Sequence, residues 1–569
     1  MSTTLQTRPL GDVARSPGFR IDVDAVSRHV TVRGKGRLTV LSNVSFAVEP
    51  GELVAIVGPS GAGKTMVLEA IAGVAPADLG SVRFDGVDLH ANARTFRGVI
   101  GYVPQDDIIH ADLPLQNTLR YAARLRLPSS TTAAEIDLAV RSAIDIVGLN
   151  EQADTRVGSL SGGQRKRASI AVELLTEPRA FFLDEPTSSL DPAASAQLVS
   201  HLRRLADRSA TVVFTTHSTD DLARCDRIVF MARGGQIGFV GTIDEALSEF
   251  GVDSLESLYV LLAEGRTTPY PARPADAPSQ QSSHALTERR PVAGGFTQWR
   301  VLTRRTLETF LRNRLTLAIL LASPVLVVGM FAVLFRPHAF DFHNPSPSSM
   351  VMIGFWVVFA AFFFGITYGL LQICTEHSIV RRERLVGLRL CAYVASKVTV
   401  LVPFLLVVIV AMLGVLRLLG RLPARPLATY ASISTTLLLC SIAALALGLL
   451  TSAAVRNVAQ ATLALPMLCF PAVLFAGAVL PVHLMAKAGA ALSLLMPSRW
   501  AFDAIGHDLG ARRILAHGGS PLGRPLLTSF GSAGRASTPT YWIILASFVV
   551  VLLVATWAVL VRSTGRPAR

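Results

Sequence analysis

The run GELVAIVGPSGAGKTMVLEAIAG, at residues 51–73, decides the fold of the first half of this chain. Its apolar part LVAIV predicts a buried strand, and the residues after Lys64 have the spacing of a helix. Between strand and helix lies a phosphate-binding loop, whose residues are Gly58, Pro59, Ser60, Gly61, Ala62, Gly63, Lys64 and Thr65. The glycines let backbone N–H groups surround phosphates, Lys64 is expected to reach the β- and γ-phosphates, and the Thr65 hydroxyl is expected to ligate Mg²⁺. The run therefore predicts an α/β P-loop domain that binds a nucleoside triphosphate.

Outward from this loop, residues 21–264 alternate short β-branched runs with helical stretches, which favours parallel strands joined by crossover helices. The run AFFLDEP, at residues 180–186, reads as a buried strand that ends in two carboxylates. We expect Asp184 beside the metal and Glu185 to act as the general base that polarises the attacking water. Taken alone, the run fits an exposed strand end equally well, but the phosphate-binding loop upstream favours the nucleotide role.

The length and composition indicate at least two domains. The chain has 569 residues, too many for one compact core, and 51% of them are hydrophobic. A net charge of +14 raises the alternative of a nucleic-acid partner, but the sequence contains no DNA- or RNA-binding module, so we expect no nucleic acid. The five cysteines stand in no CxxC pair, which disfavours a disulfide framework or a zinc site. The first 18 residues lack an apolar core, so no cleavable secretory signal is expected.

The second half of the chain is predicted to be a membrane domain. Residues 1–20 are predicted to be a flexible N-terminus and residues 265–295, rich in Pro, Ser, Ala and Gly, a disordered linker. Residues 296–314 have arginines interleaved with apolar residues, which fits a connecting helix on the membrane surface or one packed on the cytoplasmic domain. Residues 315–569 are expected to be all-α with six crossings, at about 315–334, 349–373, 397–416, 429–452, 459–480 and 541–561.

An even number of crossings places both ends of the membrane domain on the cytoplasmic side, with the nucleotide-binding domain. The arginines near residues 381–389 agree with the positive-inside rule, whereas Arg417, Arg421 and Arg425 would lie outside. We therefore expect a multi-pass protein of the cell membrane, with a composition compatible with a bacterial inner membrane.

A small-residue turn at residues 160–164, LSGGQ, runs into the helical sequence RKRASIAVELL. It resembles the signature motif of the ATP-binding cassette (ABC) family, through Ser161, Gly162, Gly163 and Gln164. The resemblance implies that the signature of one subunit closes on the ATP held by the phosphate-binding loop of the other. Two composite ATP sites with Mg²⁺ per dimer follow from it.

Three further positions are similar to the family in order. Gln105, in GYVPQDD, looks like the loop glutamine that contacts the metal and the attacking water, and Asp191, in SSLDP, like the residue that crosses the dimer interface. His217, in FTTHS, looks like the switch histidine that holds the γ-phosphate, although a histidine after an apolar strand also fits a purely hydrogen-bonded role. The chain departs from the family where an aromatic residue usually stacks on adenine, because residues 26–41 contain none; His29 is one candidate to replace it.

The order of the domains, nucleotide-binding before membrane, resembles the G subfamily of half-transporters. The runs GYVPQDDIIHADLPLQNTLRYAARLRLP, CTEHSIVRRERLVGLRLCAYVASKV and LMPSRWAFDAI are similar to that group. The resemblance implies a homodimer or a heterodimer, of which we expect the homodimer, with a substrate path lined mainly by the second and fifth crossings. In the second crossing the candidate path residues are Phe355, Phe359, Phe363, Thr367 and Gln372, although such an aromatic stripe also fits lipid contact or helix packing. Glu376 and Glu383 lie among arginines where a force-carrying Arg–Glu network or solvated charges are both possible.

These features predict an ATP hydrolase coupled to export of a lipid-like, glycolipid or hydrophobic small molecule across the bilayer. A device that uses ATP to pull on or regulate a partner, without translocating a substrate, is the alternative. Transport-coupled stimulation of ATP hydrolysis by a substrate separates the two.

Overall fold

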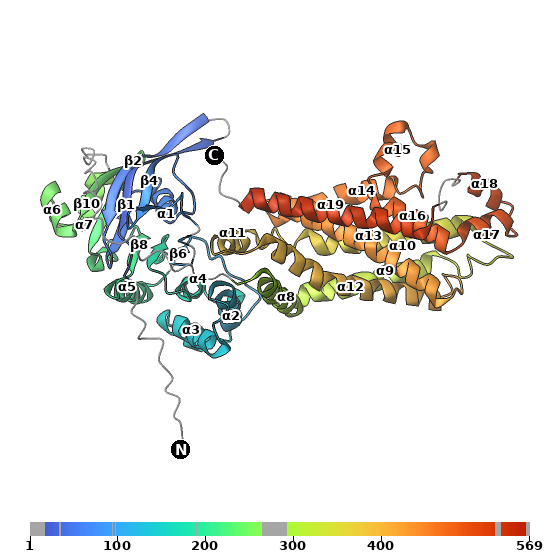
Figure 1. The fold of residues 1–569 in the computed structure, drawn as a ribbon, viewed down its shortest axis with the longest axis horizontal. Coiled ribbons are helices and arrows are strands. Elements are labelled where there is room, and N and C mark those ends of the chain that lie inside the picture. Colours follow the sequence, from blue (N-terminus) through green and yellow to red (C-terminus); the bar gives the residue numbers. More distant parts are fainter. Residues whose placement is uncertain are drawn as a thin grey trace, which may run out of the picture. The chain divides into compact units, whose positions relative to one another are not determined.

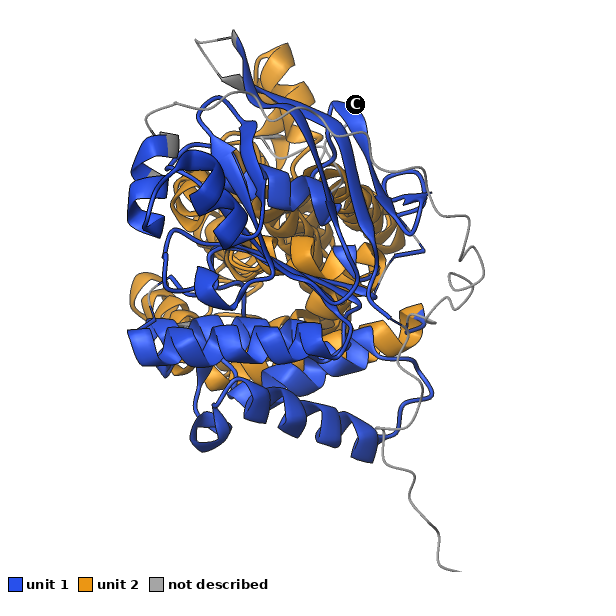
Figure 2. Ribbon diagram, turned by 90° about the vertical axis from the view of Figure 1, so that its left-hand side faces the viewer, with its two compact units in different colours: residues 1–294, 385–387, 566–569 blue, residues 295–384, 388–565 orange. Residues whose placement is uncertain are grey.

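The computed structural model describes residues 17–32, 36–93, 95–96, 98–188, 190–263, 293–529 and 536–564. The predicted flexible N-terminus and linker lie almost entirely outside the described residues. The chain divides into two compact units, coloured separately in Figure 2. Unit 1 comprises residues 1–294, 385–387 and 566–569, and unit 2 comprises residues 295–384 and 388–565.

The main sheet of unit 1 has six strands in the order β10-β9-β3-β8-β7-β6. Neighbours among β9, β3, β8, β7 and β6 are parallel, and β10 runs antiparallel to β9. Their bounds are β3 (Leu53–Val57), β6 (Ile100–Val103), β7 (Ala180–Leu183), β8 (Thr211–Thr215), β9 (Arg227–Ala232) and β10 (Gln236–Gly241). Every residue of β3, β7 and β8 is buried, as expected for continuous apolar strands covered on both faces.

A second sheet of unit 1 is antiparallel, with the order β2-β1-β4-β5. Its strands are β1 (Ile21–Val32), β2 (Gly36–Val48), β4 (Leu79–Phe84) and β5 (Val87–Asp88). The expectation of parallel strands throughout this half is wrong here. The connection from Val32 to Gly36 is too short for a crossover helix, so β1 and β2 can only pair as a hairpin.

Helices cover the main sheet of unit 1 and complete two hydrophobic cores (Figure 1). Alternate residues of β3 divide between them: Leu53, Ala55 and Val57 belong to one core, and Val54 and Ile56 to the other. The helices of this unit are α1 (Lys64–Ile71), α2 (Leu115–Arg126), α3 (Ala133–Ile146), η1 (Asn150–Gln152), η2 (Val157–Ser159), α4 (Gly162–Leu174), α5 (Pro192–Asp207), η3 (Leu222–Arg224), α6 (Ile243–Phe250) and α7 (Leu255–Ala263).

The regular elements among the described residues of unit 2 are all helices. Its helices are α8 (Gly295–Arg312), α9 (Arg314–Leu334), α10 (Pro347–Leu370), α11 (His377–Leu385), α12 (Leu390–Leu418), α13 (Leu427–Ala454), α14 (Val458–Leu474), η4 (Val482–Leu484), α15 (Lys487–Ser493), α16 (Pro497–Asp508), α17 (Ala511–His517), α18 (Gly523–Ser529) and α19 (Thr538–Thr564). The long helices α10, α13 and α19 run side by side in Figure 1, with α13 in contact with both others. Small residues let α10 and α13 approach closely, since the hydroxyl of Ser441 donates to the carbonyl of Ala361 at 2.7 Å.

Among the described residues of unit 2, four helices, α10, α12, α13 and α19, are long and apolar enough to span a bilayer. The six predicted crossings are therefore not confirmed: the apolar stretches Leu321–Leu334 and Val458–Leu474 are shorter. The helix predicted to reach residue 480 ends at Leu474, and Gly477, three residues further on, adopts a left-handed conformation with φ of 83° through which no helix could continue. At 1.5 Å per residue, α14 is about 26 Å long.

Two carboxylates beside α11 are held in ion pairs: Glu376 precedes the helix and is half-buried, and Glu383 is buried near its C-terminal end. Glu383 forms a two-pronged pair with Arg305 of α8, with one contact of 3.0 Å and side chains 10% and 4% exposed. Glu376 accepts hydrogen bonds of 2.8 Å from the hydroxyl of Tyr393 and the ammonium group of Lys397. The alternative of solvated charges is therefore wrong for these two glutamates.

Candidate nucleotide-binding site

A cavity of about 420 Å³ lies at the carboxyl end of β3, where the phosphate-binding loop joins the strand to α1. Gly58 and Gly63 have φ angles of 147° and 96°, and a side chain at either position would collide with the backbone carbonyl of Met231 or Val40, respectively. Only glycine fits both positions, so the loop backbone lies open to the cavity. The lining residues are Leu38, Thr39, Val40, Ser60, Gly61, Ala62, Gly63, Lys64, Thr65, Met66, Gln105, Glu185, Gly234 and Gly235.

The side chain of Lys64 folds back over its own loop. Its ammonium group donates to the carbonyls of Gly58 at 2.7 Å and Pro59 at 3.2 Å. Burial lowers the pKa of Lys64, and the nearby carboxylates of Glu185 and Asp184 oppose that shift. An ammonium group held in this position can exchange carbonyl oxygens for phosphate oxygens without moving far.

Two oxygen groups suited to a magnesium ion lie beside the loop. The Thr65 hydroxyl is 3.2 Å from a carboxylate oxygen of Asp184, the residue that follows β7. Asp184 is 1% exposed and also accepts a 2.6 Å hydrogen bond from the hydroxyl of Thr215, which fixes the carboxylate. Mg²⁺ prefers oxygen ligands and commonly takes one or two protein groups together with phosphate oxygens and water, so this donor set fits the ion.

Glu185 lies between two other predicted site residues. Its backbone adopts a left-handed conformation with φ of 44°, and its N–H donates to the Thr215 hydroxyl at 2.8 Å. The side-chain amide of Gln105 donates to the Glu185 carboxylate at 3.2 Å, and Nδ1 of His217 lies 3.9 Å from the other carboxylate oxygen. The His217 side chain is 64% exposed, so it remains accessible to a ligand. The fold thus brings Gln105, Glu185 and His217 together, beside the loop.

The signature residues are not part of this cavity. Ser161 caps the N-terminus of α4: its hydroxyl accepts from the N–H of Gln164, and the Gln164 side chain accepts from the N–H of Ser161. Ser161 and Gly162 are exposed, Gly163 is half-buried, and none of the four signature residues lines the cavity. Asp191 similarly caps α5 by accepting from the N–H of Ala194 at 2.8 Å.

Several residues at the site were not predicted from the sequence. Thr215, at the end of β8, accepts a hydrogen bond from the N–H of Glu185 and donates one to the carboxylate of Asp184. Gly234 and Gly235 also line the cavity. Lys166, in α4, is 3% exposed and donates to the carbonyl of Gln105 at 2.8 Å. Lys166 could have been found in the sequence as a lysine on the face of a helix whose other residues are buried.

The position ahead of the loop that contacts the cavity is aliphatic. His29, the candidate for stacking on adenine, instead bonds Asp78 at 3.1 Å and is not among the lining residues. Leu38 of β2 lines the cavity and is 55% exposed. An exposed leucine beside a polar loop offers an apolar face where the family pattern has an aromatic ring.

The aromatic residues of α10 form a continuous ladder in unit 2. Ring centroids are 6.2 Å apart both between Phe355 and Phe359 and between Phe359 and Phe363. Phe355 is 1% exposed, whereas Phe359 and Phe363 are half-buried. One turn further along, the hydroxyl of Thr367 is buried and has no hydrogen-bond partner among the described residues. Gln372 lies just beyond the end of α10 and is half-buried.

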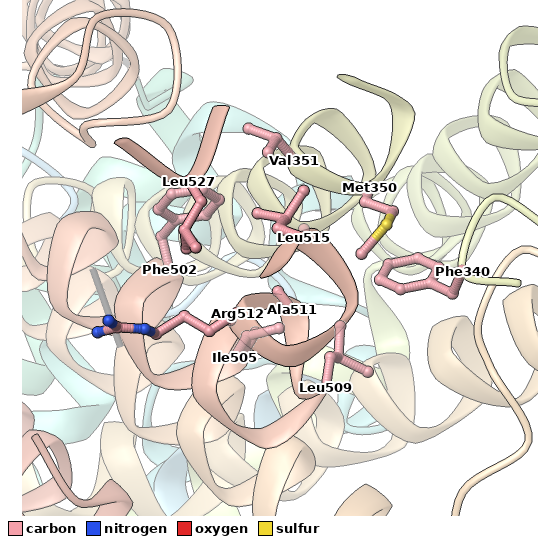
Figure 3. Close-up of a pocket in the computed structure, with 12 residues that line it drawn as sticks. Phe340, Met350, Val351, Phe502, Ile505, Leu509, Ala511, Arg512, Leu515 and Leu527 are labelled. Carbon is pink, nitrogen blue, oxygen red and sulfur yellow. The ribbon is translucent and has the colours of Figure 1, made fainter. Parts of the chain in front are cut away.

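A second cavity, of about 60 Å³, lies in unit 2 and is almost entirely apolar (Figure 3). Its lining residues are Phe340, Met350, Val351, Gly354, Phe502, Ile505, Gly506, Leu509, Ala511, Arg512, Leu515 and Leu527. In Figure 3 the guanidinium group of Arg512 points away from the side chains that surround the cavity. None of the five predicted path residues lines it.

Two family models match the chain. Residues 41–188 match the ABC transporter model and residues 297–506 match the ABC-2 type transporter model. These matches contain most of the cavity-forming motifs and most of unit 2, respectively.

Curated relatives agree with both matches. An ABC transporter ATP-binding/permease protein of Mycobacterium tuberculosis is 33% identical over 84% of this chain and 56% of its own length. The Nod factor export ATP-binding protein I of Paraburkholderia xenovorans is 34% identical over 42% of this chain and 77% of its own length. A broad substrate specificity ATP-binding cassette transporter of Bos taurus is 36% identical over 37% of this chain and 33% of its own length.

The chain spans about half or less of the length of most of these relatives, so their similarity speaks to the domains that are shared. Those shared domains are the ones whose geometry is described above: an open phosphate-binding loop with two strand-end carboxylates, followed along the chain by an apolar helical unit. The chain belongs to the ABC transporter family, with an N-terminal ATP-binding domain, a C-terminal ABC-2 type membrane domain, and relatives of the G type.

Proposed function

We propose that this protein is an ATP-driven half-transporter that exports a lipid-like, glycolipid or hydrophobic small molecule as a pair of identical copies. The observation that carries the proposal is the convergence of Lys64, Thr65, Gln105 and Glu185 on one cavity. The part of the same chain that the structure describes also contains four helices long and apolar enough to span a bilayer. One polypeptide therefore contains both the groups proposed to hydrolyse ATP and the helices proposed to form the passage through the membrane.

In the proposed reaction, Lys64 binds the β- and γ-phosphates and neutralises charge that builds up as the terminal phosphate leaves. Thr65 and Asp184 would hold Mg²⁺, which would neutralise phosphate charge when bound. Glu185 orients the attacking water and accepts its proton. Gln105 and His217, on either side of the Glu185 carboxylate, hold it toward the water and the γ-phosphate.

A second copy is needed to complete each site in this proposal. At the N-terminus of α4, Ser161 and Gly162 are exposed, Gly163 and Gln164 are half-buried, and none of the four lines the cavity of its own chain. The free N–H groups of a helix N-terminus bind anionic phosphate favourably. We infer that this turn binds the γ-phosphate of ATP in a partner copy, and that Asp191 lies at the interface between copies.

The substrate path is proposed along α10. The ladder of Phe355, Phe359 and Phe363 offers apolar ring faces, and the buried Thr367 hydroxyl offers one unpartnered polar group. Together with Gln372, this combination suits an amphipathic molecule with a few polar groups. Two relatives support a transport role: one is an ATP-binding protein of Nod factor export, and the other is a transporter of broad substrate specificity.

We place the protein in the cell membrane, with unit 1 in the cytoplasm where ATP is supplied, and propose α9 and α14 as two further crossings beside the four long apolar helices. A bacterial inner membrane is the proposed location, in accord with the mycobacterial relative.

Reconstitution tests this function. The full chain in proteoliposomes, with unit 1 facing outward, should hydrolyse ATP with Mg²⁺, and a panel of phospholipids, lipid-linked glycans and hydrophobic dyes should include at least one compound that both stimulates hydrolysis and accumulates inside. Glu185→Gln protein is the matched control and should accumulate none. Hydrolysis that no compound in a broad panel stimulates, with no accumulation, would favour the device that moves no substrate.

A further inference from the structure

A buried lysine joins three segments that meet behind the ATP cavity. Lys166, in the second turn of α4, is 3% exposed. Its ammonium group donates to the carbonyls of Pro104 at 3.0 Å, Gln105 at 2.8 Å and Asp184 at 3.3 Å. An ammonium group has three N–H donors, and these three carbonyls use all of them.

Such a buried cation is costly, so its retention needs a reason. Burial lowers the pKa of Lys166, and the carboxylates of Asp107 and Asp184 oppose the shift. An apolar side chain would avoid the desolvation cost, and removing a buried charge together with its partners is often neutral or stabilising. An apolar side chain, however, could not hold three main-chain carbonyls at fixed distances from α4.

Two of the three carbonyls belong to the site residues Gln105 and Asp184, and the third belongs to Pro104, which directly precedes Gln105. Gln105 carries the amide that donates to Glu185, and Asp184 immediately precedes Glu185 in the chain. The ammonium group therefore fixes the main chain on both sides of the Gln105–Glu185 hydrogen bond. A shift of Lys166 along the axis of α4 would change this hydrogen bond and would displace Gln105 from the attacking water.

The same helix begins at the signature turn. Ser161, which caps α4, lies five residues before Lys166, so the turn and the ammonium group move as one rigid body. In the proposed dimer, this turn contacts the ATP of the partner copy, whereas Gln105 and Glu185 serve the ATP of their own copy.

We propose that Lys166 is a positioning residue that couples the two ATP sites of the dimer, by transmitting the engagement of the signature turn to Gln105 and Glu185 of the same chain. The inference rests on the proposed function, since it requires two composite sites. Lys166 touches neither nucleotide nor water; it acts through the main chain of the residues that do.

A neighbouring cation provides a matched control. Arg167 donates to the carbonyls of Val147 at 3.1 Å and Gly148 at 3.4 Å, which lie at the end of α3 and away from the cavity. Arg167 lies on α4 beside Lys166 and also bonds main-chain carbonyls. Arg167→Gln therefore removes a similar cation without changing any contact to Gln105 or Asp184.

The experiment compares the full chain with Lys166→Gln, Lys166→Arg and Arg167→Gln in nanodiscs. Measured quantities are kcat, the Hill coefficient for ATP, the Kd for a fluorescent ATP analogue and the midpoint of thermal unfolding. We expect Lys166→Gln to lower kcat roughly tenfold or more, since small misplacement of catalytic groups is costly, while Kd stays within about twofold. The Hill coefficient should be above 1 in the unmodified protein and fall to 1 in Lys166→Gln.

Lys166→Arg, which keeps a buried cation, should recover part of kcat and a Hill coefficient above 1, and Arg167→Gln should keep both values. The proposal is overturned by an unmodified protein without cooperativity, by Lys166→Gln protein that keeps both kcat and cooperativity, or by Arg167→Gln protein that loses them equally. A loss of kcat in Lys166→Gln that only parallels a lower unfolding midpoint also overturns it. If the unmodified protein fails to hydrolyse ATP, the proposed function itself fails and the coupling falls with it.

Discussion

The side-chain amide of Gln105 donates a hydrogen bond to the carboxylate of Glu185 across 3.2 Å, although the two residues are 80 positions apart in the chain. Gln105 follows β6 and Glu185 follows β7, and these two strands are parallel neighbours. The carboxyl ends of parallel neighbours meet at one edge of the sheet, which is why this pair forms. The hydrogen bond leaves the other Glu185 carboxylate oxygen facing His217.

Replacing Glu185 by glutamine should remove the general base while keeping the shape of the side chain. We expect kcat for ATP hydrolysis to fall about 10²- to 10⁴-fold, the range typical of general base catalysis, with ATP affinity nearly unchanged. Phosphate release and equilibrium nucleotide binding measure the two effects. A Glu185→Gln protein that hydrolyses ATP within threefold of the unmodified rate would show that another group is the base.

The pair Thr65 and Asp184 should set the magnesium requirement. Asp184→Asn is expected to raise the half-saturating Mg²⁺ concentration roughly tenfold or more, because it removes a charged ligand. Phosphate release during a Mg²⁺ titration gives this value. Asp137→Asn is the control: Asp137 of α3 pairs with Arg120 of α2 at 2.8 Å and neither residue lines the cavity, so its magnesium requirement should not change.

An aromatic ring at position 38 should strengthen nucleotide binding. Leu38→Tyr supplies a face for adenine, and aromatic pairs contribute about 0.5 to 1.5 kcal/mol beyond buried area, so Kd for ATP should fall about twofold to tenfold. Competition between ATP and GTP should show little preference in the unmodified protein and a clearer preference in Leu38→Tyr. Leu79→Tyr, a change at another exposed leucine of the same sheet that does not line the cavity, should leave both values as they were.

A buried ion pair in unit 1 should be sensitive to the loss of one partner. Arg126 and Glu173 form two hydrogen bonds of 2.7 and 2.9 Å, with side chains 2% and 4% exposed. Glu173→Gln should destabilise the folded state by about 3 to 5 kcal/mol, because it leaves a buried guanidinium group without its counter-charge. The intact protein in detergent, unfolded by heat or denaturant, provides the measurement.

An exposed pair gives the comparison for that stability change. Arg203 and Asp207 lie four residues apart on α5, with side chains 25% and 58% exposed. Asp207→Asn should cost less than about 1 kcal/mol, as exposed ion pairs do. Equal effects of Glu173→Gln and Asp207→Asn would contradict the importance of burial for the Arg126–Glu173 pair.

The sequence predicted the parts of the site that local chemistry determines. The positive φ angles of Gly58 and Gly63 can only be met by glycine, and carboxylates directly after β7 can only lie at the sheet edge, so short motifs identify them. The motifs alone could not predict Thr215 or Lys166, because their partners lie on other elements and depend on strand order and helix rotation. The end of α14 could not be predicted from composition either, because the sequence stays apolar beyond Leu474. The left-handed conformation of Gly477 is visible only in the structure.

The most direct test of the composite ATP site is a cross-link between copies. In a Glu185→Gln background without the five native cysteines, one tagged copy carries Ser60→Cys in the phosphate-binding loop and a differently tagged copy carries Gly162→Cys in the signature turn. We expect ATP with Mg²⁺ to produce a covalent pair bearing both tags under mild oxidation, and ADP to produce little. A yield that is the same with and without ATP, in protein that binds the nucleotide, would contradict an ATP molecule held between the two copies.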